Sequence, residues 1–120
     1  MLVYRVETAD GRGAYSCGAK FNTISTATSP MPGSDPTLGW YDDDWCRRDW
    51  EELRFAFDSM QSFRRWFTNE DIAALAELCM LSVYEANTVR MGTYQCVFDR
   101  AEAEILQRID LKEAFFAEVD

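Results

Sequence analysis

The residues from 80 to 98 constrain the fold of this chain most, because they read as two strands separated by turn residues. Asn87 and Gly92 mark positions where the chain can turn. We therefore expect an antiparallel hairpin with strands at about 81–86 and 93–98. An isolated hairpin is marginal in water, so one of its faces must be covered, and the aromatic segment 55–67 is the expected cover. The residues suited to a pleated, half-buried surface are Val83, Tyr84, Tyr94, Val97 and Phe98.

A further strand is expected at residues 2–7, where apolar and charged side chains alternate. Leu2, Tyr4 and Val6 share one face of such a strand, and Arg5 and Glu7 share the other. A second apolar run at 53–57 is expected as a central strand.

Helices are expected where capping residues precede apolar stripes. Ser59 caps a first helix, whose stripe recurs at spacings of three and four residues. Thr68 and Asp71 form a capping box for a second helix, and Asp99 and Glu102 open a third that runs to about 107. The apolar stripe of the first helix consists of Met60, Phe63, Trp66 and Phe67.

These elements together predict an α+β fold: a small, mostly antiparallel sheet with two to three helices packed on one side. The 120 residues suffice for a single domain, 1–120, with its own core. Asp10-Gly11 predicts a turn after the first strand, with a short strand at about 14–17. A long Ser/Thr/Pro/Gly-rich loop at about 18–39 and an acidic C-terminal tail complete the expected organisation.

The residues available for chemistry exclude several classes of site. The chain has no histidine, which removes the commonest general base and the commonest partner of a Cys or Ser nucleophile. Its four cysteines are widely spaced, so we expect reduced, mostly buried thiols and no metal site or cofactor. These cysteines are Cys17, Cys46, Cys79 and Cys96. No signal peptide and no run of about 18 apolar residues is visible, so no membrane association is expected.

Charge is concentrated in two places. The net charge of −9 arises largely at 42–52 and 99–120, while the remaining residues are close to neutral. Direct nucleic-acid binding needs a basic footprint and is not expected. A basic protein surface is a natural partner, since complementary fields steer association. A solvated acidic surface without a special partner is the alternative.

The segment 39–52 has the most unusual composition. Trp and Tyr are typical interface anchors, and here they flank a run of acids, which predicts a partner-binding patch. In the alternative interpretation, the Trp residues belong to the core and the acids form a solvated edge; a catalytic or cation-binding carboxylate cluster is a third interpretation. The expected partner-binding residues are Trp40, Tyr41, Asp42, Asp43, Asp44, Trp45, Asp49, Glu51 and Glu52.

Several blocks in order along the chain resemble a group of short phage and prophage proteins. They are Val3-Tyr4-Arg5-Val6-Glu7, Gly11-Arg12-Gly13-Ala14-Tyr15, Phe55-Ala56-Phe57-Asp58-Ser59, Phe63-Arg64-Arg65-Trp66-Phe67, Val83-Tyr84-Glu85 and Gln95-Cys96-Val97-Phe98-Asp99. The resemblance implies a phage-encoded protein acting in the host cytoplasm. Small acidic proteins of this kind include inhibitors of host defence, anti-CRISPR proteins among them, so the implied partner is a basic host protein such as a CRISPR–Cas subunit.

A second resemblance is to ADP-ribosyltransferase-like folds. It rests on the Tyr-Arg of the first strand and on a late strand that ends in Val-Phe-Asp. It implies an enzyme, or its inactive relative, with Arg5, Tyr15, Glu85 and Gln95 near one cleft. Those enzymes carry a catalytic glutamate on a late strand, and this chain has Gln95 near that position, whose amide cannot act as a carboxylate. A non-enzymatic inhibitor is the preferred hypothesis, and homodimer formation is left open.

Overall fold

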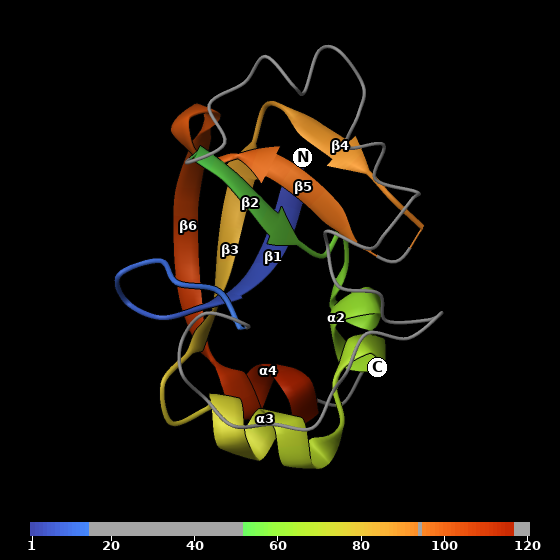
Figure 1. The fold of residues 1–120 in the computed structure, drawn as a ribbon, viewed down its shortest axis with the longest axis vertical. Helices are drawn as coiled ribbons and strands as arrows, with labels where there is room; N and C mark the ends of the chain where they lie inside the picture. Colours follow the sequence, from blue (N-terminus) through green and yellow to red (C-terminus); the bar gives the residue numbers. More distant parts are fainter. Residues whose placement is uncertain (15–51, 94, 117–120) are drawn as a thin grey trace.

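The computed structural model describes residues 1–14, 52–93 and 95–116. Within these ranges the chain forms strands in two sheets, three α-helices and one short 3₁₀ helix (Figure 1). The elements are β1 (Leu2–Glu7), β2 (Leu53–Ala56), α2 (Met60–Trp66), α3 (Asn69–Leu75), β3 (Met80–Ala86), β4 (Val89–Met91), β5 (Cys96–Asp99), η4 (Arg100–Glu102), β6 (Ala103–Asp110) and α4 (Leu111–Phe116). This is a small α+β fold with antiparallel sheets, as the sequence predicts.

Both sheets are antiparallel, and their strand orders are β1-β3-β6 and β2-β5-β4. An isolated bridge joins them: the Tyr4 N–H donates to the Phe57 carbonyl oxygen at 2.8 Å, and the Phe57 N–H donates to that of Tyr4 at 2.7 Å. One edge of β1 therefore pairs with β3, and the other meets the end of β2. Figure 1 shows the β2-β5-β4 sheet crossing in front of the β1-β3-β6 sheet, with the helices gathered at the lower end.

Two apolar clusters occupy opposite faces of the β1-β3-β6 sheet. Val6 and Leu81, which are register partners, pack with the helices. Val3 and Tyr84, which are register partners on the other face, pack against the β2-β5-β4 sheet. The cluster on the helical side contains Val6, Phe57, Phe63, Trp66, Phe67, Ile72, Leu75, Cys79, Leu81, Leu111 and Ala114, and the one between the sheets contains Val3, Ala56, Tyr84, Ala86, Cys96 and Phe98.

The capping predictions for the first two helices are confirmed. The Ser59 side chain accepts a hydrogen bond from the Ser62 N–H at 3.1 Å and begins α2. Thr68 and Asp71 form a complete capping box at the start of α3. The ring of Phe57 packs 5.5 Å from that of Trp66. The aromatic segment thus covers one face of β3, as expected.

The predicted hairpin of 81–86 with 93–98 is wrong. The strand β3 pairs with β1 and β6, whereas β5 lies in the other sheet and pairs with β2 and β4. The turn at Asn87 and Thr88 therefore carries the chain from one sheet to the other. The sequence marks this turn, but the partner of a strand depends on residues far away in the chain.

The predicted third helix, from Asp99 to about 107, is also wrong. Asp99 does act as an N-cap, since its side chain accepts from the Ala101 N–H at 3.0 Å, but the helix is the single turn η4. Residues 103–110 then extend as β6, because pairing with β3 outweighs their helical propensity. Leu111 follows β6 directly and begins α4. The expected short strand 14–17 and loop 18–39 lie almost entirely outside the described residues.

Candidate functional site

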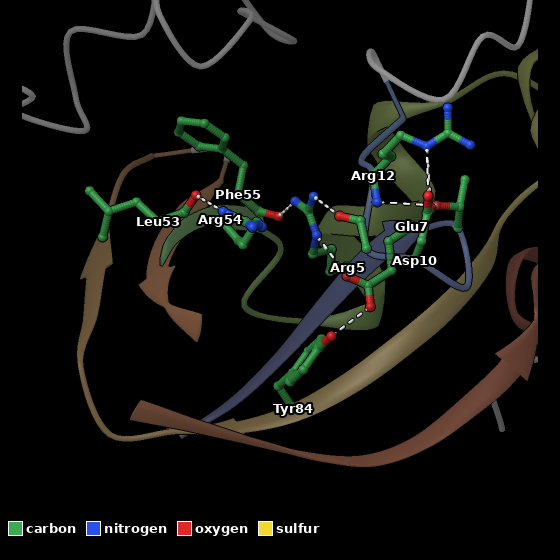
Figure 2. A network of polar contacts seen from close by, with 10 residues as sticks. Arg5, Glu7, Asp10, Arg12, Leu53, Arg54, Phe55 and Tyr84 are labelled. Atoms are coloured by element: carbon green, nitrogen blue, oxygen red, sulfur yellow. Dashed lines mark hydrogen bonds and ion pairs between the residues drawn. The ribbon is translucent and has the colours of Figure 1, made fainter. Parts of the chain in front are cut away.

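The guanidinium of Arg5 is the centre of a network of polar contacts (Figure 2). Its Nε donates to Glu7 Oε1 at 2.9 Å, its Nη1 to the Phe55 carbonyl oxygen at 2.8 Å, and its Nη2 to the Gly11 carbonyl oxygen at 3.1 Å. Both members of the Arg5–Glu7 ion pair are buried. Since an unpaired buried charge is strongly destabilising, neither side chain can be lost alone without a large cost.

The second oxygen of Glu7 is bound by Tyr84. The Tyr84 hydroxyl donates to Oε2 at 2.6 Å, a charge-assisted hydrogen bond. Burial raises the pKa of Tyr84, and the hydrogen bond to Glu7 raises it further. Burial lowers the pKa of Arg5, although its proximity to Glu7 opposes that shift. Tyr84 therefore stays neutral and acts as a hydrogen-bond donor, not as a nucleophile.

The residues around this network add positive charge and one unsatisfied hydroxyl. Arg100 lies 5.0 Å above the centre of the Tyr84 ring, a cation–π contact. Arg54 is close enough to lower the pKa of Arg5. Ser82, the register partner of Arg5 on β3, is buried and its Oγ has no hydrogen-bond partner.

Two glycines shape the turn that follows β1. Gly11 has φ +89°, a conformation that favours glycine, and its carbonyl oxygen accepts from Arg5. A Cβ atom on Gly13 would lie 2.9 Å from Arg5 Nη2, so a side chain there would displace the guanidinium. The Gly11-Arg12-Gly13 run thus accommodates Arg5, which the sequence did not suggest.

Arg5, Glu7 and Tyr84 therefore join three strands and one turn. The contacts reach β1, the residues just before the undescribed segment 15–51, the strand β2 just after it, and β3. Such an arrangement fixes backbone geometry. The sequence contained one usable signal, since Arg5 and Glu7 lie two residues apart and share a face of a strand.

The residues expected for an ADP-ribosyltransferase-like cleft do not converge among those described. Arg5 is paired with Ser82, and Glu85 with Leu2, so Arg5 and Glu85 point to opposite faces of the sheet. Glu85 binds the N-terminal ammonium group at 2.6 Å. Gln95 is buried, and its backbone carbonyl oxygen accepts a hydrogen bond from the Gly92 N–H. Tyr15 lies outside the described residues. No observation in the described structure favours this activity.

Most of the predicted partner-binding residues also lie outside the described ranges: Trp40, Tyr41, Asp42, Asp43, Asp44, Trp45, Asp49 and Glu51. Of that set, the structure describes Glu52, which is half-buried just before β2. In the second acidic segment, four carboxylates are exposed along β6 and its two ends. They are Glu102, Glu104, Asp110 and Glu113.

The described cysteines, Cys79 and Cys96, are buried. Burial raises the pKa of Cys96 to about 12, so it is not a reactive thiolate at neutral pH. In the part of the chain that the structure describes, no three or more Cys, Asp or Glu side chains are arranged to hold a metal ion. No helix there is long and apolar enough to cross a membrane.

A family model described as "Bacteriophage T4 Y00F protein" matches residues 1–112. No curated protein and no solved structure matches the chain. The matched range includes every described strand and therefore the whole Arg5–Glu7–Tyr84 network.

Proposed function

The chain belongs to the bacteriophage T4 Y00F protein family, and from that premise we propose that this phage protein binds and inhibits a host defence protein. The proposed target is a basic, nucleic-acid-binding surface in the host cytoplasm, such as a groove of a CRISPR–Cas subunit. The acidic protein occupies that surface and excludes the nucleic acid, as an anti-CRISPR protein would.

The observation that carries the proposal is the uneven distribution of carboxylates. Six acids and two bases lie in residues 42–52, next to Trp40, Tyr41 and Trp45. In the described structure several acids of the second segment, among them Glu104 and Asp110, are exposed on β6 and near its ends. A surface of this kind complements a groove built for phosphates, and aromatic side chains supply anchors.

The test is capture of a partner from host lysate with the tagged full chain, followed by mass spectrometry. We expect a stoichiometric basic protein whose binding weakens with added salt. The triple variant Asp42→Asn, Asp43→Asn and Asp44→Asn should reduce the amount captured.

The matched control removes three charges elsewhere, at exposed positions: Asp58→Asn, Glu70→Gln and Glu77→Gln. It should capture the partner as well as the unmodified chain does. Equal loss in both triple variants would reduce the effect to net charge, and capture unaffected by salt and by Asp42–Asp44 would remove the proposal.

A further inference from the structure

The strand β6 is the outer strand of the β1-β3-β6 sheet and is largely exposed. Among the described strands it pairs with β3 alone, and it forms the left margin of that sheet in Figure 1. Leu106 is 53 % exposed, more than most large apolar residues of the described core strands. An outer strand with uncovered backbone groups is a template for a further strand.

The pairing shows which backbone groups are available. The Ala86 N–H donates to the Met1 carbonyl oxygen at 2.8 Å, so Ala86 directs its backbone groups towards β1. Because successive residues of a strand alternate, Glu85 directs its groups towards β6 and bonds its partner Glu104. Ile105, the next residue of β6, therefore points its N–H and C=O away from β3.

A β-bulge limits the length of the edge that the described strands leave unpaired. Val83 pairs with Gln107 and Tyr84 pairs with Ile105, so Leu106 is the extra residue. Beyond it the alternation is shifted, and a new strand cannot pair continuously along β6. The usable edge is the part before the bulge, Ala103–Leu106, which we call the β6 edge.

Carboxylates surround the β6 edge. Glu85 and Glu104 are direct cross-strand partners, and both are exposed. Like charges in such a pair are destabilising. The N-terminal ammonium group binds Glu85, and the Thr88 hydroxyl binds Glu102. A cation on an incoming strand, opposite Glu104, would relieve the repulsion between Glu85 and Glu104.

A second copy of this chain is less suited to the β6 edge. Two-fold pairing centred on Leu106 would place Glu104 opposite Arg108 of the other copy. The bulge puts these two side chains on different faces, since Glu104 shares a face with Glu85 and Arg108 with Ser82. Two molecules of net charge −9 also repel one another.

We propose that the β6 edge pairs with an extended basic segment of the partner protein, which adds a strand to the β1-β3-β6 sheet. The backbone of Ile105 supplies the hydrogen bonds, and Glu85, Glu102 and Glu104 select Lys or Arg side chains. This inference rests on the proposed function only for the basic character of the partner, because the β6 edge includes none of residues 42–44.

The test uses the full chain and a synthetic ten-residue peptide that alternates lysine with threonine. By NMR titration, the largest amide shifts should occur at Glu104, Ile105 and Leu106. The Glu104→Lys variant should bind the peptide at least about fivefold more weakly. The control Glu113→Lys makes the same charge change on the exposed side of α4 and should alter affinity by less than about twofold.

Two further peptides separate backbone pairing from general attraction. A version N-methylated at alternate residues lacks the donors for strand pairing and should not bind, and the peptide with glutamate in place of lysine should not bind either. Equal losses in Glu104→Lys and Glu113→Lys, or undiminished binding of the N-methylated peptide, would overturn the inference. Dimers that Glu104→Lys dissociates would overturn it in favour of a second copy.

The peptide assay involves no host protein, so it fails independently of the proposed function. If the chain binds the peptide but captures no host protein, the inference about the β6 edge stands and the proposed inhibitor function is rejected. If the chain captures a basic host protein and the Glu104→Lys variant captures it equally well, the proposed function stands and pairing of the partner with the β6 edge is rejected.

Discussion

At the scale of single residues, the buried ion pair of Arg5 and Glu7 in β1 limits which substitutions the fold tolerates. Glu7 accepts from Arg5 and from the Tyr84 hydroxyl, so its charge is compensated from two directions. Tyr84→Phe removes one donor and leaves the ring in place. We expect a loss of about 1–3 kcal/mol in the free energy of unfolding, because a buried carboxylate loses a hydrogen bond. Urea unfolding measures it. Tyr4→Phe, a change in a half-buried tyrosine of β1, is the control and should cost less.

The buried thiol of Cys96 and the buried hydroxyl of Tyr84 predict how the free energy of unfolding depends on alkaline pH. The pKa of Cys96 is raised from 9.0 to about 12, and that of Tyr84 is raised from 10.0. Above pH 9 the unfolded chain therefore releases these protons before the folded chain does. The resulting contribution to stability is complete below about pH 9 and is lost as pH rises towards the folded-state values. Unfolding free energies measured under reducing conditions at pH 8 and pH 10.5 should show the fall. Tyr84→Phe should show a smaller fall, and an equal one would contradict the assignment to Tyr84.

At the scale of elements, the capping signals predicted helix starts well because a cap depends only on residues within one turn. The Thr68 side chain accepts a hydrogen bond from the Asp71 N–H at 3.2 Å, so Thr68→Ala breaks the capping box of α3. We expect destabilisation by about 1 kcal/mol, measured by thermal or urea unfolding. Asn69→Ala, at the exposed first residue of the same helix, should have little effect and is the control.

Strand partners were predicted less well, because pairing joins residues far apart in the chain. The turn at Asn87 indicated a hairpin, yet Glu85 pairs with Leu2 on one side and Glu104 on the other. The helical signal at Asp99 was real but extended for a single turn. For the polar network, the shared face of Arg5 and Glu7 was visible, whereas its contact with Tyr84 needed the tertiary fold.

The same pairing predicts a gradient of protection within the β1-β3-β6 sheet. The strand β3 is bonded on both sides, but β6 is bonded to β3 alone among the described strands. Hydrogen exchange followed by mass spectrometry should therefore show slower exchange in residues 80–86 than in residues 103–110. Comparable exchange in both peptides would mean that the outer edge of β6 is covered.

At the scale of the whole molecule, the net charge should affect association with a partner more strongly than it affects the stability of the fold. The net charge of −9 predicts that capture of a basic partner falls steeply as salt rises from about 50 to 300 mM, because screening shortens the range of attraction. The fold itself should hardly respond, since its described ion pairs are few and its core is apolar. Parallel measurements of capture and of melting temperature against salt would separate the two. A melting temperature that follows the loss of capture would contradict this separation.

The position of Arg5 makes two parts of the framework depend on one side chain. Its guanidinium bonds to the carbonyl oxygens of Gly11, in the turn after β1, and of Phe55, in β2. Removing that side chain would therefore release both segments at once, and it would leave the buried carboxylate of Glu7 without its cation.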